Sequence, residues 1–298
     1  MPELPDLELY LSSLKRLIGG EEIDAVQIKS PFFVRTFEPD VSECVGKKII
    51  GFRRLGKRIV WLLEEGSCLV FHLMVAGRFH WKSKVTFPKS KNDLAAFRFG
   101  DRTLMVTEAS QKKRASLHVV PKQDDLIALT PPGLEIFTMT YEEFKSQLKM
   151  QNHTLKRALT DPKLFSGIGN AYSDEILHHA RLSPIQWTSR LLEEEIKVLF
   201  RSIRSTIRHW IDLLHQQTGD KFPEKVTAFR PEMAVHGKFG RPCPECGTIV
   251  QRIRYADKET NYCPRCQTDG KLLADRSLSR LLKDDWPKTI DELEQLSE

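Results

Sequence analysis

Hydrophobic positions divide the chain into stretches of different spacing. Between Leu7 and Ile18 apolar residues recur every three or four positions, which predicts an amphipathic helix that a Gly-Gly pair ends. From residue 22 to about residue 120 the apolar residues form short runs separated by Gly, Pro, Asn and Asp. These runs predict strands of a β-sandwich or barrel-like domain, in the segments IDAVQI, KKIIGF, RIVWLL, CLVFHLMV, AAFRF, TLMVT and LHVV.

Helical spacing returns at Tyr141 and continues to about residue 216, so an all-helical domain is expected after the β domain. Little periodicity is present between residues 219 and 240, where a mobile loop is expected. The pattern therefore predicts an α+β multidomain chain. Its expected parts are a β-sandwich domain with a leading helix (1–125), a helical domain (133–218), the loop (219–240), a cysteine-rich segment (241–270) and a C-terminal extension of unassigned role (271–298).

Composition narrows the class of protein. The chain has 298 residues, 40% of them hydrophobic and 29% charged, which is typical of a globular protein with a sizeable core. No run of eighteen apolar residues and no secretory leader is found, so we expect a cytoplasmic protein without a membrane span. Lys and Arg exceed Asp and Glu by 46 to 40, and the resulting charge of +6 is compatible with a polyanionic partner.

Four of the six cysteines form two Cys-x-x-Cys pairs, sixteen residues apart. They are Cys243, Cys246, Cys263 and Cys266. This spacing is typical of a tetrahedral four-thiolate zinc site, whereas a disulfide framework would be unusual in a reducing compartment. Because four thiolates leave zinc no open coordination position, one structural zinc ion in a hairpin is predicted, and catalysis must come from elsewhere.

Basic residues gather at three places. One is the twelve-residue window from Lys47 to Arg58, which has no acidic residue, and another is the segment from Gln111 to Arg114. The third is a helical stripe of Arg201, Arg204 and Arg208. Each cluster alone is more often a solvated surface, but together with the zinc hairpin they favour binding to phosphates.

The stretch from Gly167 to Asn170 lies between two predicted helices. Its glycines permit a tight turn, and the N–H groups that open the second helix could bind an anion. Lys156, on the preceding helix, could add a positive charge to the same site. On local pattern alone, an ordinary helix–helix turn is the more common explanation.

The N-terminal sequence MPELPD contains two proline–acid pairs. Pro5 and Asp6 suit the first turn of the helix that follows, because proline fits there and a carboxylate favours the positive end of the helix dipole. Pro2 and Glu3 precede that turn and are not explained by it.

Four motifs, in this order, resemble the formamidopyrimidine-DNA glycosylase and endonuclease VIII family. They are MPELPD, the lysine of RRLGKR, GIGNAYSDEIL, and the pair CPEC and CPRC. The resemblance extends from residue 1 to about residue 267. It implies an N-terminal helix and β-sandwich, a helix-two-turn-helix domain and a zinc-finger hairpin, in an enzyme that excises oxidised bases from double-stranded DNA during base-excision repair. A monomer in the bacterial cytoplasm, acting at the nucleoid, is expected.

The resemblance also explains Pro2 and Glu3. In the family the nucleophile is the amine of an N-terminal proline, exposed once the initiator methionine is removed, and Pro2 matches it. It forms a Schiff base with the sugar, and β,δ-elimination then cleaves the strand. Glu3 matches the acid/base residue, and Lys57 matches a lysine that contacts the lesion's phosphate and assists elimination.

Further matches concern DNA contacts. Asn170 and Lys156 match the family's phosphate clamp, His72 matches a histidine of the same surface, and Arg114 is expected to contact DNA from its basic cluster. Lys258 replaces an arginine that lies five residues before the third cysteine. Since lysine lacks the planar fork of arginine, we expect weaker δ-elimination or looser positioning of the lesion.

Other departures affect specificity. Asp6 is one methylene shorter than the family's usual glutamate, and the loop TEASQKKRASL lacks the segment that reads the opposite base in many relatives. The methionine that serves as a wedge in relatives aligns with Val75 of this chain, and Met74 lies one position earlier. On a strand, neighbouring side chains point to opposite faces, so only one of these two residues could take the wedge position. The preferred lesion, the opposite-base preference and the wedge residue therefore stay open.

Two other classes of function are compatible with some of these features. One is a catalytically weak protein that binds damaged DNA or abasic sites on the same scaffold. The other is an enzyme that uses an N-terminal proline as a base on a small molecule, and the basic clusters argue against it.

Overall fold

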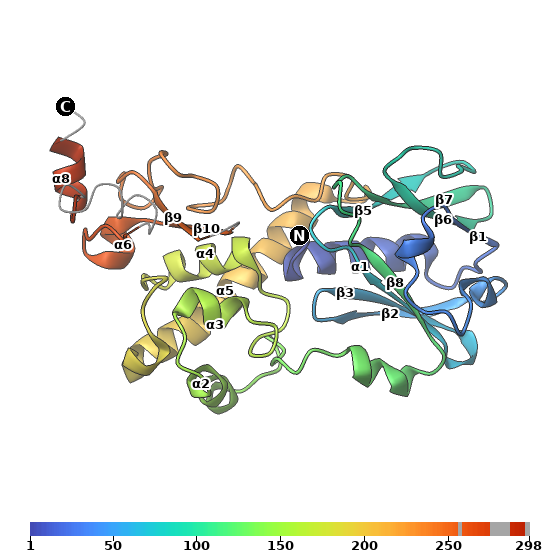
Figure 1. Cartoon of the computed structure of the whole chain (residues 1–298), viewed down its shortest axis with the longest axis horizontal. Helices are drawn as coiled ribbons and strands as arrows, with labels where there is room; N and C mark the ends of the chain where they lie inside the picture. The colour runs from blue at the N-terminus through green and yellow to red at the C-terminus, as the bar shows by residue number, and fades with distance from the viewer. Residues whose placement is uncertain (256–257, 275–286, 296–298) are drawn as a thin grey trace. The chain divides into compact units, whose positions relative to one another are not determined.

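The computed structural model describes the chain except for residues 256–257, 275–286 and 296–298 (Figure 1). The chain divides into two compact units. The first comprises Met1–Pro131 and Trp210–Ala228, and the second comprises Pro132–His209 and Phe229–Glu298.

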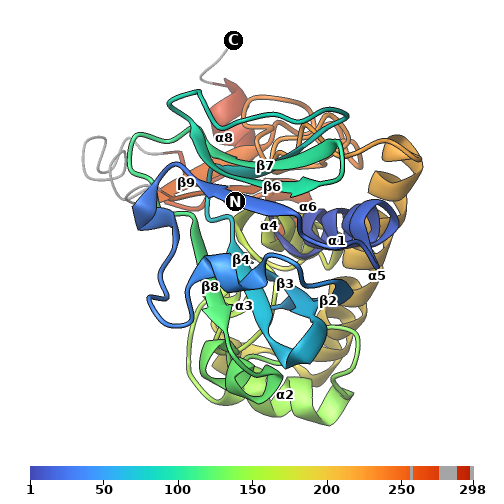
Figure 2. The ribbon, with the colours of Figure 1, turned by 90° about the vertical axis from the view of Figure 1, so that its right-hand side faces the viewer.

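The first unit contains helix α1 (Leu4–Ile18) and two antiparallel sheets, which lie one above the other in Figure 2. One sheet has the order β1-β6-β7-β5, with β1 at Ala25–Ile28, β6 at Asp93–Phe99, β7 at Arg102–Glu108 and β5 at Gly77–Lys82. The other has the order β2-β3-β4-β8, with β2 at Ile49–Leu55, β3 at Arg58–Leu63, β4 at Cys68–His72 and β8 at Ser116–Val120. Short 3-10 turns occur at Pro31–Phe33 (η1), Val41–Cys44 (η2), Glu64–Gly66 (η3) and Gln123–Leu129 (η4).

Aromatic side chains from both sheets form the core of the sandwich. Phe71 on β4 lies with its ring centroid 4.7 Å from that of Trp61 on β3, 5.4 Å from that of Phe79 on β5 and 5.5 Å from that of Phe97 on β6. All four side chains are buried, and Tyr10 of α1 contacts Phe79 edge to face at 5.4 Å. The predicted helix and β-sandwich are therefore confirmed.

Two details of the strand prediction were wrong. Strand β5 was not predicted, because the polar residues of GRFHWK weaken its hydrophobic signal although Phe79 is fully buried. Strand β4 ends at His72 instead of continuing to Val75, because Met74 adopts a φ of +52° and the N–H of Gly77 bonds to the carbonyl of Leu73 at 2.8 Å. Met74 and Val75 thus lie on a tight turn and not on a strand.

The second unit contains the predicted helices. They are α2 (Tyr141–Lys149), α3 (Leu155–Thr160), α4 (Asn170–His179), the 3-10 turn η5 (Thr188–Arg190) and α5 (Glu193–Thr218), whose last residues belong to the first unit. The core between α2 and α5 includes Phe144, whose ring centroid lies 5.3 Å from that of Phe165 and 5.4 Å from that of Phe200. The helical region and its position in the chain are therefore confirmed.

The cysteine-rich segment is a hairpin, as predicted. Strands β9 (Gln251–Tyr255) and β10 (Lys258–Tyr262) pair antiparallel, and the short helix α6 (Pro264–Thr268) follows them. The described part of the C-terminal extension folds back on the residues that follow α6: Lys271 bridges to Thr289, and α8 (Ile290–Gln295) begins with a buried isoleucine. Among the described residues no helix has the length and apolar character that a membrane span requires.

Candidate functional site

The N-terminus of the first unit is held by the start of α1. Glu3 is the N-cap residue of the helix, and its backbone N–H donates to the carboxylate of Asp6 at 3.0 Å. Glu3 is 3% exposed and Asp6 is 1% exposed, so both acids are buried. Such caps stabilise a helix by about 1 kcal/mol. Pro2 is also buried, directly before this cap.

The α-amino group at the end of the chain lies in a mixed electrostatic environment. Burial lowers the pKa of the Met1 amine below its usual value of 8.0, Glu3 opposes this shift, and Arg78 and Lys57 add to it. A lowered pKa leaves more of the amine uncharged at neutral pH, and an uncharged amine is the nucleophilic form.

Lys57 lies at the tip of the β2–β3 hairpin. Leu55 pairs with Arg58, so Gly56 and Lys57 form a two-residue loop, and Gly56 has a φ of +62°. A side chain at Gly56 would place its Cβ 2.8 Å from Pro131, so glycine is required there. The tight loop fixes the backbone of Lys57.

Arg78 was not predicted as a site residue. Its guanidinium donates to the carbonyls of Val226 and Gly77, each at 2.6 Å, and it lowers the pKa of the terminal amine. A lone arginine after a glycine gives no sequence signal for this role, because its partner Val226 is almost 150 residues away.

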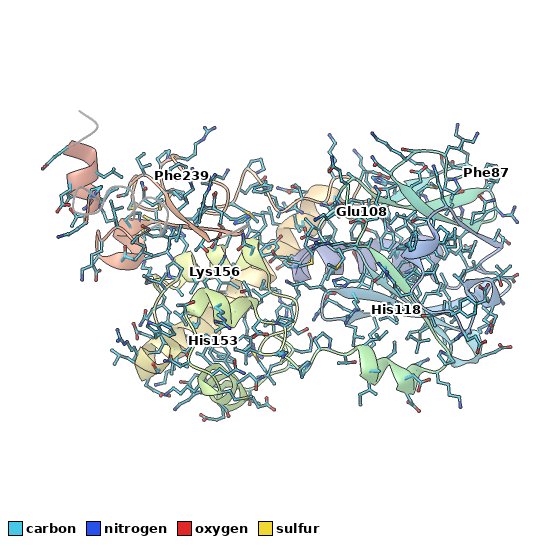
Figure 3. The ribbon with its side chains drawn as sticks, in the orientation of Figure 1. Phe87, Glu108, His118, His153, Lys156 and Phe239 are labelled. Atoms are coloured by element: carbon cyan, nitrogen blue, oxygen red, sulfur yellow. The ribbon has the colours of Figure 1, made fainter. Side chains whose placement is uncertain are left out.

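His72 ends β4 and lies diagonally across from His118 on β8, which Figure 3 labels. Burial, with smaller contributions from the nearby Arg58, Lys57 and His118, lowers the pKa of His72 to about 4. The pKa of His118 is lowered as well, by burial and by two arginines. His72 is therefore a neutral imidazole at physiological pH.

The loop after β7 is organised by Glu108, which is 1% exposed and is labelled in Figure 3. Its carboxylate accepts hydrogen bonds from the N–H groups of Arg114 and Ala115 at 2.8 and 2.9 Å and from the hydroxyl of Ser110 at 2.8 Å. The side chain of Arg114 is exposed. On the turn after β4, Val75 is 61% exposed and Met74 is half-buried.

In the second unit, Lys156 on α3 reaches the start of α4 (Figure 3). Its ammonium donates to the backbone carbonyl of Asn170 at 2.6 Å and to the carboxylate of Asp174 at 2.5 Å. Asn170 in turn donates from its side chain to the carbonyl of Glu259 on β10 at 2.9 Å. The structure thus brings Lys156 and Asn170 together, as the resemblance implies.

A buried acidic pair on α4 was missed from the sequence. The carboxylate of Asp174 is fully buried and also bonds to the Nδ1 of His236 at 2.7 Å. The neighbouring Glu175 accepts the backbone N–H groups of three consecutive residues, Ala234, Val235 and His236, at 2.8 to 3.0 Å. Burial raises the pKa of Glu175, and these three hydrogen bonds oppose the shift. The two acids hold the segment after Phe229 against α4.

Several residues of the basic clusters bind the protein itself. Arg54 forms an ion pair with Glu8 at 2.9 Å, and Arg58 donates to the carbonyl of Leu129 at 2.5 Å. Arg204 donates to three carbonyls between residues 136 and 139, and Arg208 lies 4.5 Å above the ring of Phe137. These arginines stabilise the fold.

The four cysteines of the hairpin form a metal site. Their Sγ atoms all lie within 4.8 Å of one another, with separations of 3.4 Å for Cys246–Cys263, 3.5 Å for Cys246–Cys266 and 4.0 Å for Cys243–Cys266. Tetrahedral zinc with Zn–S bonds of about 2.3 Å requires sulfur separations of about 3.8 Å. The donor set therefore fits one zinc ion. Lys258 begins β10, at the end of the strand away from Cys263, and its side chain lies outside the described residues.

Three family models match successive parts of the chain. The formamidopyrimidine-DNA glycosylase N-terminal domain matches residues 1–114, the H2TH domain of the same enzymes matches residues 131–221, and a zinc finger found in FPG and IleRS matches residues 240–268. The third match agrees with the four-cysteine geometry, so the hairpin is a zinc finger. The C-terminal extension lies beyond the matched residues.

Curated relatives and solved structures agree with these matches. The formamidopyrimidine-DNA glycosylases of Carboxydothermus hydrogenoformans and Thermus thermophilus are 32% and 31% identical to the chain, and the alignments cover 90% and 91% of this chain and all of each relative. The Lactococcus lactis Fpg in complex with DNA that contains an abasic site is 27% identical with a TM-score of 0.80, covering 89% of this chain and 99% of that one.

A second complex of the Lactococcus lactis enzyme contains DNA with a Fapy-dG lesion. It is 28% identical with a TM-score of 0.79, covering 89% of this chain and all of that one. Sequence motifs, sandwich, helical region and zinc finger all agree with these relatives in kind and order. The chain therefore belongs to the formamidopyrimidine-DNA glycosylase family.

Proposed function

We propose that this protein is a bifunctional DNA glycosylase and abasic-site lyase that excises oxidised bases from duplex DNA in base-excision repair. Its relatives are named as glycosylases, and the similar solved structures contain abasic-site or Fapy-dG DNA. A substrate in genomic DNA supports a location in the bacterial cytoplasm at the nucleoid.

The observation that supports this function most is the environment of the terminal amine. Its pKa is lowered, and the buried acid Glu3 is close by in the chain. Once Met1 is removed, the secondary amine of Pro2 becomes the terminus in this environment. An α-amino group titrates near ~8, so a modest decrease provides the uncharged nucleophile at neutral pH.

The reaction begins when the lone pair of the Pro2 nitrogen attacks C1′ of the damaged nucleotide. The glycosidic bond breaks, and the base leaves with the bonding electrons and a proton supplied by an acid, the role proposed for Glu3. The attached amine loses its N–H proton, and its lone pair then forms the C1′=N⁺ double bond as the C1′–O4′ bond of the sugar ring breaks and O4′ takes up a proton. The resulting positively charged iminium withdraws electrons from the opened sugar. Loss of a C2′ proton then expels the 3′ phosphate, a second elimination expels the 5′ phosphate, and water releases the sugar fragment from Pro2.

Lys57 is proposed to contact the phosphate of the lesion and to assist elimination. Its place on the tip of a constrained hairpin and its electrostatic effect on the terminal amine support this role. Lys258 is proposed to contact a second phosphate from the zinc hairpin as a point charge.

His72, Lys156, Asn170 and Arg114 are proposed to bind the DNA backbone. A neutral His72 can donate one hydrogen bond to a phosphate without a change of charge near neutral pH. The opening turn of α4 and the nearby Lys156 provide the partial and full positive charges that phosphates favour. Binding should weaken steeply as salt increases, because phosphate contacts release counterions.

A second candidate is a protein that binds damaged DNA but catalyses weakly. Two observations favour it. Arg54, Arg58 and Arg204 bind other groups of the protein, and the loop around Glu108 lacks the segment that many relatives have there. Fewer side chains are therefore left to bind DNA. The two functions differ in whether strands are cut.

The test is a panel of duplexes with 8-oxoguanine, formamidopyrimidine, thymine glycol, hydantoin or an abasic site, each opposite several bases. A bifunctional enzyme cuts the abasic duplex and at least one lesion duplex, and a Pro2→Gly variant loses this cleavage. A protein that binds these duplexes without cutting any of them would support the second candidate. Cleavage that persists in the Pro2→Gly variant would contradict the mechanism.

A further inference from the structure

One face of helix α4 contacts the zinc finger along its whole length. Asn170, Asp174 and His178 follow one another at intervals of four residues, so they lie on the same face. Asn170 bonds to the carbonyl of Glu259, Asp174 accepts the N–H of Asn261 at 3.3 Å, and the Nε2 of His178 lies 3.3 Å from the Sγ of Cys243. Each of these three side chains contacts a different part of the zinc finger.

The last contact involves a zinc ligand directly. His178 is 6% exposed and Cys243 is 2% exposed, so their contact is shielded from water. Four thiolates around Zn²⁺ carry a net charge of −2, and a buried thiolate has few water molecules to stabilise it. An N–H donor at this distance supplies that stabilisation, because charge-assisted hydrogen bonds are stronger than neutral ones and are worth more in a buried site.

We propose that His178 is a positioning residue of the zinc site: its Nε2–H donates to the thiolate of Cys243 and fastens the zinc finger to helix α4. Partners of this kind orient metal ligands and tune their affinity. The role is separate from the catalytic assignments, because none of the residues proposed to react with DNA takes part in the bond.

A neighbouring side chain fixes the same interface. Gln267 of α6 donates to the carbonyl of Leu182 at 2.9 Å and accepts the N–H of Cys263 at 2.9 Å. The zinc finger is therefore joined to α4 through the side chain of the ligand Cys243. Through Gln267, the backbone of the ligand Cys263 is also linked to Leu182, which follows α4. Zinc occupancy should therefore depend on α4 as well as on the hairpin.

The first experiment measures how fast zinc leaves the protein in excess chelator, with a chromogenic zinc indicator. His178→Leu removes the donor, whereas the nearly isosteric His178→Gln keeps an N–H. His179→Leu is the matched control, because His179 is the next residue of the helix, is exposed and contacts only the hydroxyl of Ser205 among the interactions described. Loss of an outer partner typically costs 10- to 100-fold in metal affinity.

We expect zinc release to be at least about 10-fold faster for His178→Leu, and within about 3-fold of the wild type for His178→Gln and His179→Leu. In the cobalt-substituted protein, the thiolate-to-cobalt charge-transfer band should shift for His178→Leu and stay in place for the other two. Wild-type release and an unmoved band in His178→Leu would overturn the proposal.

A measurement on the unaltered protein remains decisive if the leucine variant does not fold. In protein loaded with ¹¹³Cd, a hydrogen bond to Cys243 transmits scalar coupling between the metal and the Nε2 proton of His178. The proposal predicts this correlation in a proton–cadmium NMR spectrum. A spectrum that shows the cysteine correlations but none to His178 would contradict it.

Discussion

The carboxylate of Asp6 accepts the backbone N–H of Glu3 at 3.0 Å, and both residues are buried. Aspartate is one methylene shorter than the family's usual glutamate, yet Asp6 reaches the backbone of Glu3, the residue next to Pro2, and caps the first turn of α1. The cap that starts the helix therefore also fixes the backbone from which the proposed nucleophile extends.

Replacing Asp6 by alanine should lower both stability and activity. The lost cap costs about 1 kcal/mol in the free energy of unfolding, measured by urea denaturation. Cleavage of abasic-site DNA should fall further than this loss explains, because Glu3 and Pro2 are no longer held. Thr140→Ala, which removes the cap of α2, is the control and should lower stability alone. Equal cleavage rates for the two variants would show that the Asp6 cap has no role in the site.

His72 should make the protein less stable as the pH falls. Its pKa is about 4 in the fold, against about 6.5 in an unfolded chain, so only the unfolded state takes up a proton between these values. The free energy of unfolding should therefore decrease as pH falls from about 6.5 towards 4, by up to about 3 kcal/mol from this group.

Urea denaturation of the wild type and His72→Gln at pH 7.5 and pH 5.0 measures the effect. The variant should lose less stability between the two pH values than the wild type does. An identical loss in both proteins would show that His72 is not the group responsible.

Lys156 should be important for stability as well as for DNA binding. Its side chain is 12% exposed and that of its partner Asp174 is fully buried, so Lys156→Ala leaves a buried carboxylate without its cation. We expect a loss of about 3 kcal/mol in the free energy of unfolding. Lys145→Ala is the control, because its pair with Glu193 is similar in length but much more exposed, and it should lose less than about 1 kcal/mol. Similar losses for the two variants would contradict this view of Lys156.

Local signals explain what the sequence predicts well. The spacing of apolar residues identifies α1 and the helices from α2 to α5, because helical periodicity depends on neighbours within one or two turns. The four cysteines are equally clear, since a metal site of two Cys-x-x-Cys pairs is defined by spacing. Both kinds of prediction are confirmed.

Long-range pairs explain what the sequence leaves out. Arg54 belongs to a basic window in the sequence, yet its charge is paired with Glu8, 46 residues away. The links from Asp174 to His236 and from His178 to Cys243 join residues more than 60 positions apart. No periodicity encodes such partners, so the interactions that hold α4 to the zinc finger become visible only in three dimensions.

The proposed mechanism requires that the nitrogen of Pro2 forms the covalent bond to the sugar. Borohydride reduction during turnover of abasic-site DNA, followed by protease digestion and mass spectrometry, identifies the residue that carries the reduced sugar. We expect one modified peptide, which begins at Pro2, lacks Met1 and carries the sugar on its terminal nitrogen. A sugar trapped on Lys57 or another lysine, or an active protein that retains Met1, would contradict it.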